Sequence, residues 1–158
     1  MCKEIVFATS EDEAELQELF TGYGMGLAGE IEEHVLVKTA NKVSAGALLA
    51  QIDTNFFHLL VFAVHEDGRN KGIGSQLLQE IIKNPEKYCQ TPFDSNDSLY
   101  KVTTVAKGDA VRFYEKNGFV ACDFSKLAEP YDEQCLECPD KEDCKPVAMI
   151  VECHKYIV

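Results

Sequence analysis

Positive charge and long apolar runs are both scarce in this sequence. The 158 residues include 15 Lys and Arg against 27 Asp and Glu, so the formal net charge is -12. This excess of negative charge argues against nucleic acid or an anionic membrane as a partner, because both would be repelled. No apolar run approaches the roughly 18 residues that a membrane span needs. The acidic balance is compatible with a cationic acceptor such as an amine, and equally with solubility alone.

Signals for secretion and for a disulfide framework are also lacking. Residues 1–4 lead directly into the apolar residues 5–7, and this run is too short for a secretory signal. We therefore expect a cytoplasmic protein in a reducing compartment, where seven cysteines, an odd number, would not form a full disulfide framework. At this length we expect a single domain over residues 1–158, with a cysteine-rich insert at about 125–146.

The hydrophobic pattern predicts an α/β fold. Ser10 and Asp109 are the expected N-caps of the first and last helices, and Pro85 should stop the middle one. Helices are expected from Ser10 to near Gly22, from Gly72 to about Lys83, and around 109–117. Strands are expected at 3–8, 34–38, 43–52, 55–64, 99–105, 119–124 and 146–158. This order gives a single-domain mixed sheet of about seven strands flanked by helices.

A glycine-rich turn joins the strand at 55–64 to the helix from Gly72. Residues 69–74 read Arg-Asn-Lys-Gly-Ile-Gly. The first turn of a helix has unpaired N–H groups and a partly positive end, and glycines let a ligand approach that backbone closely. Such a turn suits phosphate or pyrophosphate, although an ordinary helix-capping loop has the same composition. The spacing matches neither a Walker loop nor the three-glycine dinucleotide motif.

A second motif follows further along the chain. Residues 110–119 read Ala-Val-Arg-Phe-Tyr-Glu-Lys-Asn-Gly-Phe, a short helix with Gly118 as a left-handed C-cap. Phe113 is expected to pack in the core. The Arg-x-x-Gly-x-Gly turn and this Phe-Tyr…Gly-Phe helix occur in the order and spacing of the GCN5-related N-acetyltransferase (GNAT) family. The sequence resembles that family over about residues 3–124 and in a final strand near 146–152.

The resemblance implies both a fold and a reaction. In the GNAT fold, the strands at 55–64 and 99–105 are parallel and splay apart, and the pantetheine arm of the cofactor lies between them. The implied reaction is direct transfer of an acetyl group from acetyl-CoA to a primary amine. The residues implied to hold the cofactor, mainly through their backbone, are Phe62, Ala63, Val64, Arg69, Asn70, Lys71, Gly72, Ile73 and Gly74.

Two side chains are implied to act as acid and base. Tyr114 lies where relatives place the acid that protonates the departing thiolate, and a tyrosine is protonated at neutral pH. His58 lies where the histone-acetyltransferase branch has a glutamate base, and the ordinary histidine pKa near 6.5 would suit that role. The alternative for His58 is a packed strand histidine with a satisfied hydrogen bond. Other carboxylates that could serve as the base are Glu32, Glu33 and Glu66.

One position departs from the family pattern. Relatives often have an asparagine at the end of the fifth strand, where this chain has Val105, and the neighbouring Thr104 could compensate. This departure leaves open a second function class, a non-catalytic acyl-CoA-binding or metal- or redox-responsive module on the same fold. For the enzyme, the expected partner is a small-molecule or peptide amine, with no nucleic acid and no membrane, in a chain that could form a homodimer. Another acyl-CoA could also replace acetyl-CoA.

The expected insert contains three closely spaced cysteines. Cys135, Cys138 and Cys144 follow a Cys-x2-Cys-x5-Cys pattern, of which the first part is a common zinc half-site. The same ligands could hold an iron–sulfur cluster. A disulfide or redox-responsive pair and an inert loop are the alternatives. The candidates for a fourth metal ligand are Cys122, Cys153 and His154. In the family this connection often borders the acceptor site, so the insert could influence which amine is accepted.

Overall fold

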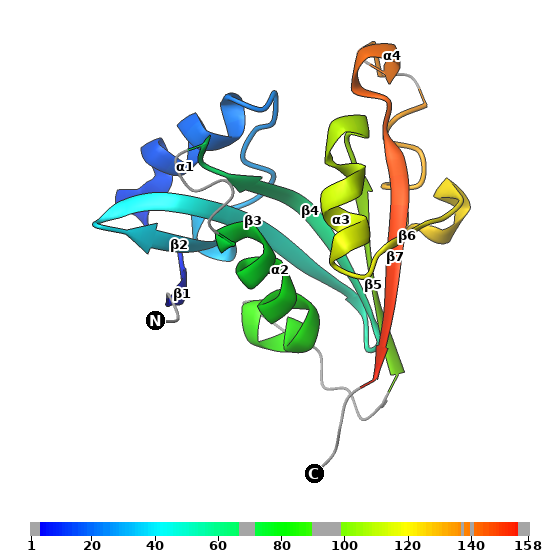
Figure 1. Cartoon of the computed structure of the whole chain (residues 1–158), viewed down its shortest axis with the longest axis horizontal. Coiled ribbons are helices and arrows are strands. Elements are labelled where there is room, and N and C mark those ends of the chain that lie inside the picture. Colours follow the sequence, from blue (N-terminus) through cyan, green and yellow to red (C-terminus); the bar gives the residue numbers. More distant parts are fainter. Residues whose placement is uncertain (1–3, 67–71, 90–98, 137, 140, 155–158) are drawn as a thin grey trace. The chain divides into compact units, whose positions relative to one another are not determined.

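A computed structural model describes residues 4–66, 72–89, 99–136, 138–139 and 141–154 of the chain. Within these residues, seven strands form one mixed sheet in the order β1-β2-β3-β4-β5-β7-β6, with β4 and β5 parallel (Figure 1). The predicted fold class is therefore confirmed. The strands are β1 (Ile5–Phe7), β2 (Val35–Thr39), β3 (Lys42–Asp53), β4 (Phe56–Val64), β5 (Leu99–Ala106), β6 (Val120–Ala121) and β7 (Val147–His154).

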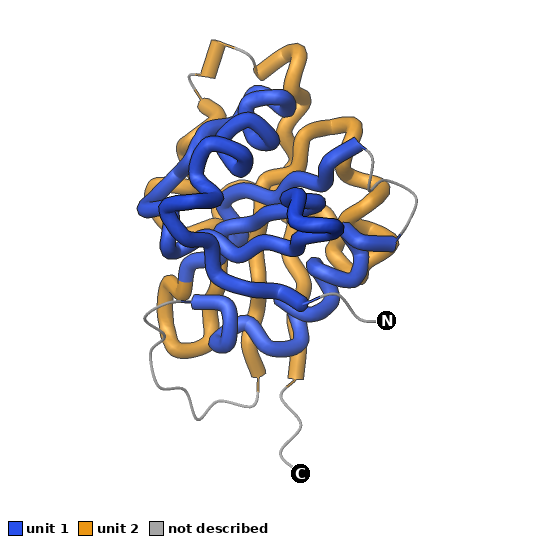
Figure 2. Tube along the Cα trace, turned by 90° about the vertical axis from the view of Figure 1, so that its left-hand side faces the viewer, with its two compact units in different colours: residues 1–50, 59–92 blue, residues 51–58, 93–158 orange. Residues whose placement is uncertain are grey.

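The chain divides into two compact units (Figure 2). The first unit comprises Met1–Ala50 and Leu59–Pro92, and the second comprises Gln51–His58 and Phe93–Val158. The expectation of one domain over residues 1–158 stays a prediction. None of the helices in the described part of the chain has the length and apolar character of a membrane span.

The first unit packs α1 (Glu13–Thr21) against its strands. β2 pairs antiparallel with both β1 and β3. The apolar residues of α1 recur at helical spacing and are buried, and the helix ends at Gly22, as expected. The buried residues of this core are Ala8, Leu16, Leu19, Phe20, Ile31, Leu36, Val43, Leu48, Val61 and Ala63.

The second long helix of this unit, α2 (Ile73–Lys83), begins where the glycine-rich turn predicts. Gly72 is its N-cap and has φ +77°, a left-handed conformation that glycine adopts without a steric penalty. The helix ends before Pro85, which opens the short 3-10 helix η4 (Pro85–Tyr88). One stripe of α2 is buried and consists of Ile73, Gly74, Leu77, Leu78, Ile81 and Ile82.

The second unit is built around the pairing of β5 with β7. Eight residue pairs join these antiparallel strands, from Leu99 with His154 to Ala106 with Val147. β6 pairs with β7 on its other side. Between β5 and β6 lies α3 (Val111–Lys116), and Gly118 follows it with φ +96°, which confirms the expected left-handed residue. A further short helix, α4 (Lys141–Cys144), was not predicted.

Both predicted N-caps are wrong. Before α1, the capping pair consists of Thr9 and Asp12, which enclose the 3-10 helix η1 (Ser10–Asp12). The Thr9 N–H donates to Asp12 Oδ2 at 2.9 Å. Asp109 lies inside the 3-10 helix η5 (Gly108–Ala110), after which α3 begins. In both places an extra 3-10 turn precedes the α-helix, and the hydrophobic period does not reveal such a turn.

Three strands differ in length from their predicted ranges. β1 is short, although the Ala8 N–H still donates to His34 O at 2.8 Å. β6 contains only two residues because the chain turns into the 3-10 helix η6 (Phe124–Lys126). β7 ends at His154, and the predicted extension over 155–158 lies outside the described residues.

Candidate active site

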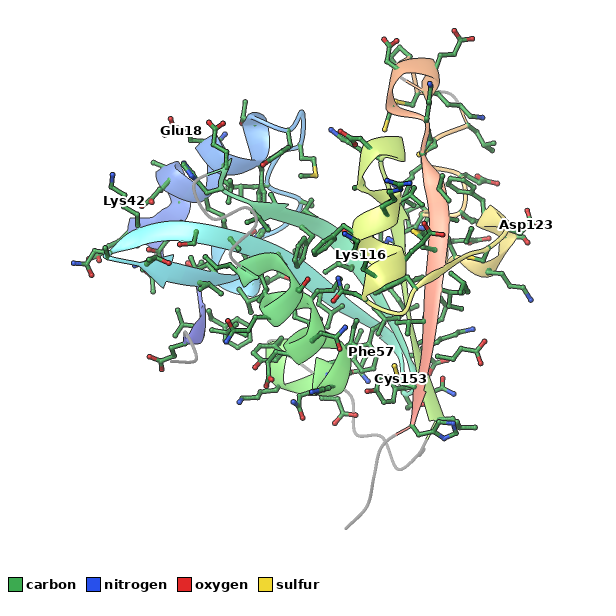
Figure 3. All side chains as sticks on the ribbon, in the orientation of Figure 1. Glu18, Lys42, Phe57, Lys116, Asp123 and Cys153 are labelled. Atoms are coloured by element: carbon green, nitrogen blue, oxygen red, sulfur yellow. The ribbon has the colours of Figure 1, made fainter. Side chains whose placement is uncertain are left out.

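His58, the predicted base, lies near the start of β4 and is only 1% exposed. Its Nδ1 lies 2.8 Å from Thr103 Oγ1. The Thr103 hydroxyl donates its single proton to Phe57 O at 3.4 Å, and Phe57 is labelled in Figure 3. Since Thr103 has no second proton to donate, we assign the His58 hydrogen to Nδ1, which leaves the lone pair on Nε2. That nitrogen is therefore the one that could accept a proton.

An aromatic ring from the expected insert covers His58. The ring of Tyr131 stacks on the imidazole with a centroid distance of 4.1 Å and an interplanar angle of 15°. Burial lowers the pKa of His58 from 6.5 to about 4. The value near 6.5 assumed from sequence is thus corrected, because the imidazole is removed from water and its charged form is disfavoured. At neutral pH the ring is uncharged.

Tyr114, the predicted acid, is also buried, at 6% exposure on α3. Burial raises the pKa of its hydroxyl, and a hydrogen bond from the Thr104 side chain partly opposes that rise. Its ring meets Phe113 and Phe119 edge to face, at centroid distances of 5.4 and 5.3 Å. The hydroxyl is therefore protonated at neutral pH and held in an apolar setting.

Two consecutive threonines of β5 contact the two predicted catalytic residues. Thr103 bonds to His58, and Thr104 bonds to Tyr114. Both threonines are buried, at 0% and 2% exposure. Because successive side chains of a strand point to opposite faces, these contacts lie on opposite faces of β5. Val105 shares a face with Thr103, so Thr104 does not occupy the place of the missing asparagine side chain.

The residues implied to hold the cofactor lie in the first unit, as far as they are described. Phe62, Ala63 and Val64 end β4, and the Val64 carbonyl accepts a hydrogen bond from the Tyr23 hydroxyl at 2.6 Å. Gly72 precedes α2, and Ile73 and Gly74 form its first turn. The first turn of a helix has no preceding helical carbonyls to accept from its N–H groups, which is why such a turn suits an anion. Arg69, Asn70 and Lys71 lie outside the described residues.

A pocket of about 630 Å³ lies within the first unit. Its walls come from α1, the start of β3 and the residues after β4, and include Glu18 and Lys42, which are labelled in Figure 3. Glu66, one of the alternative bases, is exposed and lines this pocket. Glu32 and Glu33 are exposed in the 3-10 helix η2 (Ile31–Glu33), where Glu33 Oε1 accepts from the Glu30 N–H at 3.1 Å.

The predicted metal site at Cys135, Cys138 and Cys144 has no support among the described residues and stays a prediction. Burial raises the pKa of the Cys135 thiol, and the nearby Cys144 and Cys138 raise it further, whereas a hydrogen bond with Gln134 lowers it. Across the described residues, no three His, Cys, Asp or Glu side chains are arranged to hold a metal ion. Cys122 and Cys153, two candidate fourth ligands, are also free thiols.

Two residues of this region, Tyr131 and Asp132, were not predicted from the sequence. Tyr131 covers His58, and Asp132 follows it directly. Asp132 Oδ1 is buried and has no hydrogen-bond partner among the described residues. A tyrosine beside an acidic residue in a polar connection gives no periodic pattern that would single it out. The sequence supported only the general expectation that this connection borders the acceptor site.

Comparison with known proteins identifies the fold. Residues 31–121 match the model of the acetyltransferase (GNAT) domain family. N-acetylglutamate synthase from Neisseria gonorrhoeae, solved with coenzyme A and N-acetyl-glutamate, is similar with a TM-score of 0.75 at 15% identity. The match covers 98% of this chain and 36% of the synthase, so the present chain spans about a third of the length of the synthase.

Two smaller solved proteins are similar over nearly their whole length. Ard1 from Thermoplasma volcanium has a TM-score of 0.65 at 16% identity, over 98% of this chain and 100% of that one. The ribosomal-protein-S18-alanine N-acetyltransferase from Escherichia coli has a TM-score of 0.59 at 15% identity, over 99% of this chain and 96% of that one. A search of curated protein sequences found no significant match. Because the family model matches more than half of its residues, the chain belongs to the acetyltransferase (GNAT) domain family.

Proposed function

We propose that the chain transfers an acetyl group from acetyl-CoA to a primary amine by direct attack. The observation that carries this proposal is the pair of contacts on β5 of a GNAT domain, where Thr103 holds an uncharged, buried histidine and Thr104, on the opposite face, holds a buried tyrosine hydroxyl. The two side chains would act on the thioester from the two faces of the sheet, with the thioester in the gap between β4 and β5. In the balanced reaction, the amine nitrogen bonds to the thioester carbonyl carbon and the carbon–sulfur bond breaks. The amine proton passes to the base, and the departing thiolate, hydrogen-bonded to Tyr114, takes its proton from water.

The cofactor would be held by backbone groups at two places in the first unit. The pantetheine amides would bind peptide groups at Phe62–Val64, where the Val64 carbonyl already accepts from the Tyr23 hydroxyl at 2.6 Å. The first turn of α2 would present its N–H groups to the pyrophosphate, and Gly72 has no side chain to obstruct them. Among the described residues, no atom lies within 4 Å of a Cβ added at Gly72. Arg69 and Lys71 would add positive charge, and Asn70 a further peptide group.

His58 would accept the amine proton at Nε2. Its lowered pKa means that the ring is already unprotonated at neutral pH, so the base is always in its active form. The same lowering makes it a weaker base than an ordinary histidine, and the geometry is equally that of a packed strand histidine. A pH–rate profile of a His58 variant distinguishes the two roles.

Tyr114 would stabilise the departing thiolate through a hydrogen bond. Its pKa is raised above that of an ordinary tyrosine and therefore lies above that of a thiol. Complete proton transfer from this phenol to the thiolate is then uphill, whereas a hydrogen bond to the developing negative charge is favourable. The phenol can accept from Thr104 and donate its own proton at the same time.

The test is acetyl transfer from acetyl-CoA to a panel of amines, followed by mass spectrometry because seven cysteines would react with a thiol dye. We expect Tyr114→Phe to lower kcat by roughly ten- to a hundredfold, the value of a hydrogen bond to a charged group, and to leave acetyl-CoA affinity nearly intact. Tyr88→Phe is the matched control, since it removes another buried hydroxyl, bonded to Glu80 at 2.9 Å. A kcat equal to wild type would exclude Tyr114 from the reaction.

The acceptor class follows from the neighbours and the charge. Similar structures are named for an amino-acid acceptor and for the alanine of a ribosomal protein, so small-molecule and peptide amines both belong in the panel. The net charge of -12 favours cationic amines over anionic partners. A cytoplasmic location fits the free thiols at the described cysteines. Light scattering would decide whether the chain is a homodimer.

A further inference from the structure

The Tyr23 hydroxyl bonds to the backbone at the place where the cofactor is proposed to bind. It donates to the Val64 carbonyl at 2.6 Å, although the two residues are 41 positions apart in the sequence. Val64 is the last residue of β4 and one of the three whose peptide groups are implied to bind the pantetheine arm. Both residues belong to the first unit, so the contact lies within one compact part of the chain.

The Val64 carbonyl points away from β3. The next N–H group, that of His65, donates to Ser44 O on β3 at 2.7 Å. In a planar trans peptide, the carbonyl and the following N–H point in opposite directions. The Val64 oxygen therefore lies on the side of β4 opposite β3. The family resemblance places the pantetheine arm on that side, so the hydroxyl and the cofactor would approach the same oxygen.

The backbone of Tyr23 is held in place, whereas its side chain has space beside it. Its N–H donates to Phe20 O at 3.0 Å, and the Met25 N–H donates to the same carbonyl at 2.9 Å. The residue lines the pocket of about 630 Å³, together with His65, which directly follows Val64. Rotation of the side chain toward this pocket would separate the hydroxyl from the Val64 oxygen without movement of the backbone.

We propose that the Tyr23 hydroxyl competes with acetyl-CoA for the Val64 carbonyl, and that an amide N–H of the pantetheine arm displaces it when the cofactor binds. No covalent bond changes, because one donor to the carbonyl replaces another and the phenol then bonds to water. This inference rests on the proposed function, since it concerns how the same site accepts its cofactor. Tyr23 thus sets the affinity for acetyl-CoA without contact with the reacting atoms.

The alternative to displacement is sharing, because a carbonyl oxygen has two lone pairs. Displacement is favoured because the hydroxyl, 2.6 Å from the oxygen, brings its phenol ring to the side of β4 that the arm needs. The two cases differ in a variant without the hydroxyl. Under displacement, wild type loses a hydrogen bond when the cofactor binds, and Tyr23→Phe has none to lose. Under sharing, removal of the hydroxyl leaves the affinity unchanged or lowers it.

The decisive experiment is isothermal titration calorimetry with CoA, which binds without turnover. We expect Tyr23→Phe to bind CoA about three- to tenfold more tightly than wild type, the value of one hydrogen bond. The nucleotide half of CoA, 3′-phospho-ADP, lacks the pantetheine arm, so wild type and Tyr23→Phe should bind it equally. Tyr88→Phe removes a hydroxyl that bonds to Glu80 elsewhere in the first unit, and its CoA affinity should equal that of wild type.

Urea unfolding with and without CoA separates competition from a purely structural hydrogen bond. Without CoA, Tyr23→Phe should be less stable than wild type because it lacks the bond to Val64. With saturating CoA the two proteins should be equally stable, because wild type has lost that bond as well and the tighter binding of the variant offsets its deficit. A deficit that is the same with and without CoA would overturn the inference.

The outcomes distinguish this inference from the proposed function. A CoA affinity of Tyr23→Phe equal to or below that of wild type would overturn the competition and leave the proposed acetyl transfer standing. An equal gain in affinity for 3′-phospho-ADP would also overturn it, because the effect would not involve the pantetheine arm. The expected gain for CoA without transfer to any amine would refute only the proposed function. Failure of both proteins to bind CoA would refute both.

Discussion

Burial of His58 should make the stability of this protein depend on pH between about 4 and 6.5. The folded-state pKa is about 4, against 6.5 for an ordinary histidine, because the ring is removed from water. The folded chain therefore binds this proton less readily than the unfolded chain does. The contribution to stability is fully present above about pH 6.5 and is lost as the pH falls through the folded-state value.

The size of the effect follows from these two proton affinities. Linkage gives a loss of about 1.4 kcal/mol between pH 7.5 and 5.5, and about 2 kcal/mol by pH 5.0, from His58 alone. The loss approaches about 3 kcal/mol at still lower pH. Because the side chain is only 1% exposed, solvent screening should reduce these values little.

Urea unfolding of wild type and His58→Gln, followed by circular dichroism at pH 7.5, 5.5 and 5.0, measures this directly. Glutamine retains a polar group for Thr103 but does not titrate, so the difference between the two proteins should shrink by about 2 kcal/mol over the range. Carboxylates that titrate in both proteins cancel in that difference. His65→Gln makes the same replacement at an exposed histidine and is the control. A constant difference from pH 7.5 to 5.0 would refute the reasoning.

Three glycine-to-alanine variants should separate crowding from backbone strain in urea unfolding. Gly46→Ala should destabilise by about 1–3 kcal/mol, because the added Cβ would overlap the buried Leu16 Cδ1. Gly72→Ala should cost about 1 kcal/mol through its left-handed φ of +77°, although no atom of the described residues lies within 4 Å of the added Cβ. Gly26→Ala places its Cβ where no atom of the described residues lies within 4 Å, and its backbone is not left-handed, so its stability should equal that of wild type. A loss of stability in Gly26→Ala would contradict the assignment of crowding to Gly46 and of backbone strain to Gly72.

Long amphipathic and apolar segments were predictable from sequence because their burial imposes a period. α2 begins after Gly72 and ends before Pro85 because glycine supplies the left-handed start and proline cannot continue the helix. The start of α1 was misplaced for a different reason. Thr9 and Asp12 satisfy each other across a 3-10 turn, and Ser10 offers a cap that looks equally good in sequence.

The contacts around the candidate site were less predictable because they join residues far apart in sequence. The bond between His58 and Thr103 depends on which residues of β4 and β5 lie opposite each other, and hydrophobic pattern alone does not set this register. Tyr131 reaches His58 from an irregular connection, where no period exists to predict where it lies. The predicted metal site relied on cysteine spacing, which constrains the distances along the chain but not the geometry of the thiols.

Burial affects His58 as a base in two opposite ways, and the pH–rate profile separates them. It keeps the imidazole unprotonated at neutral pH, and it lowers the affinity for the proton that the base must accept. The groups against the ring are the Thr103 hydroxyl and Tyr131, whose own pKa is raised by burial, so neither should titrate near neutral pH.

If His58 is the base, the pH–rate profile of kcat/KM should show its break near pH 4 and none near 6.5, and His58→Gln should lose that break together with most of the rate. A break near 6.5 that disappears in His58→Gln would mean that the ring is hydrated in solution. A profile and rate identical to wild type would leave His58 as a packing residue, hydrogen-bonded to Thr103 and taking no part in the reaction.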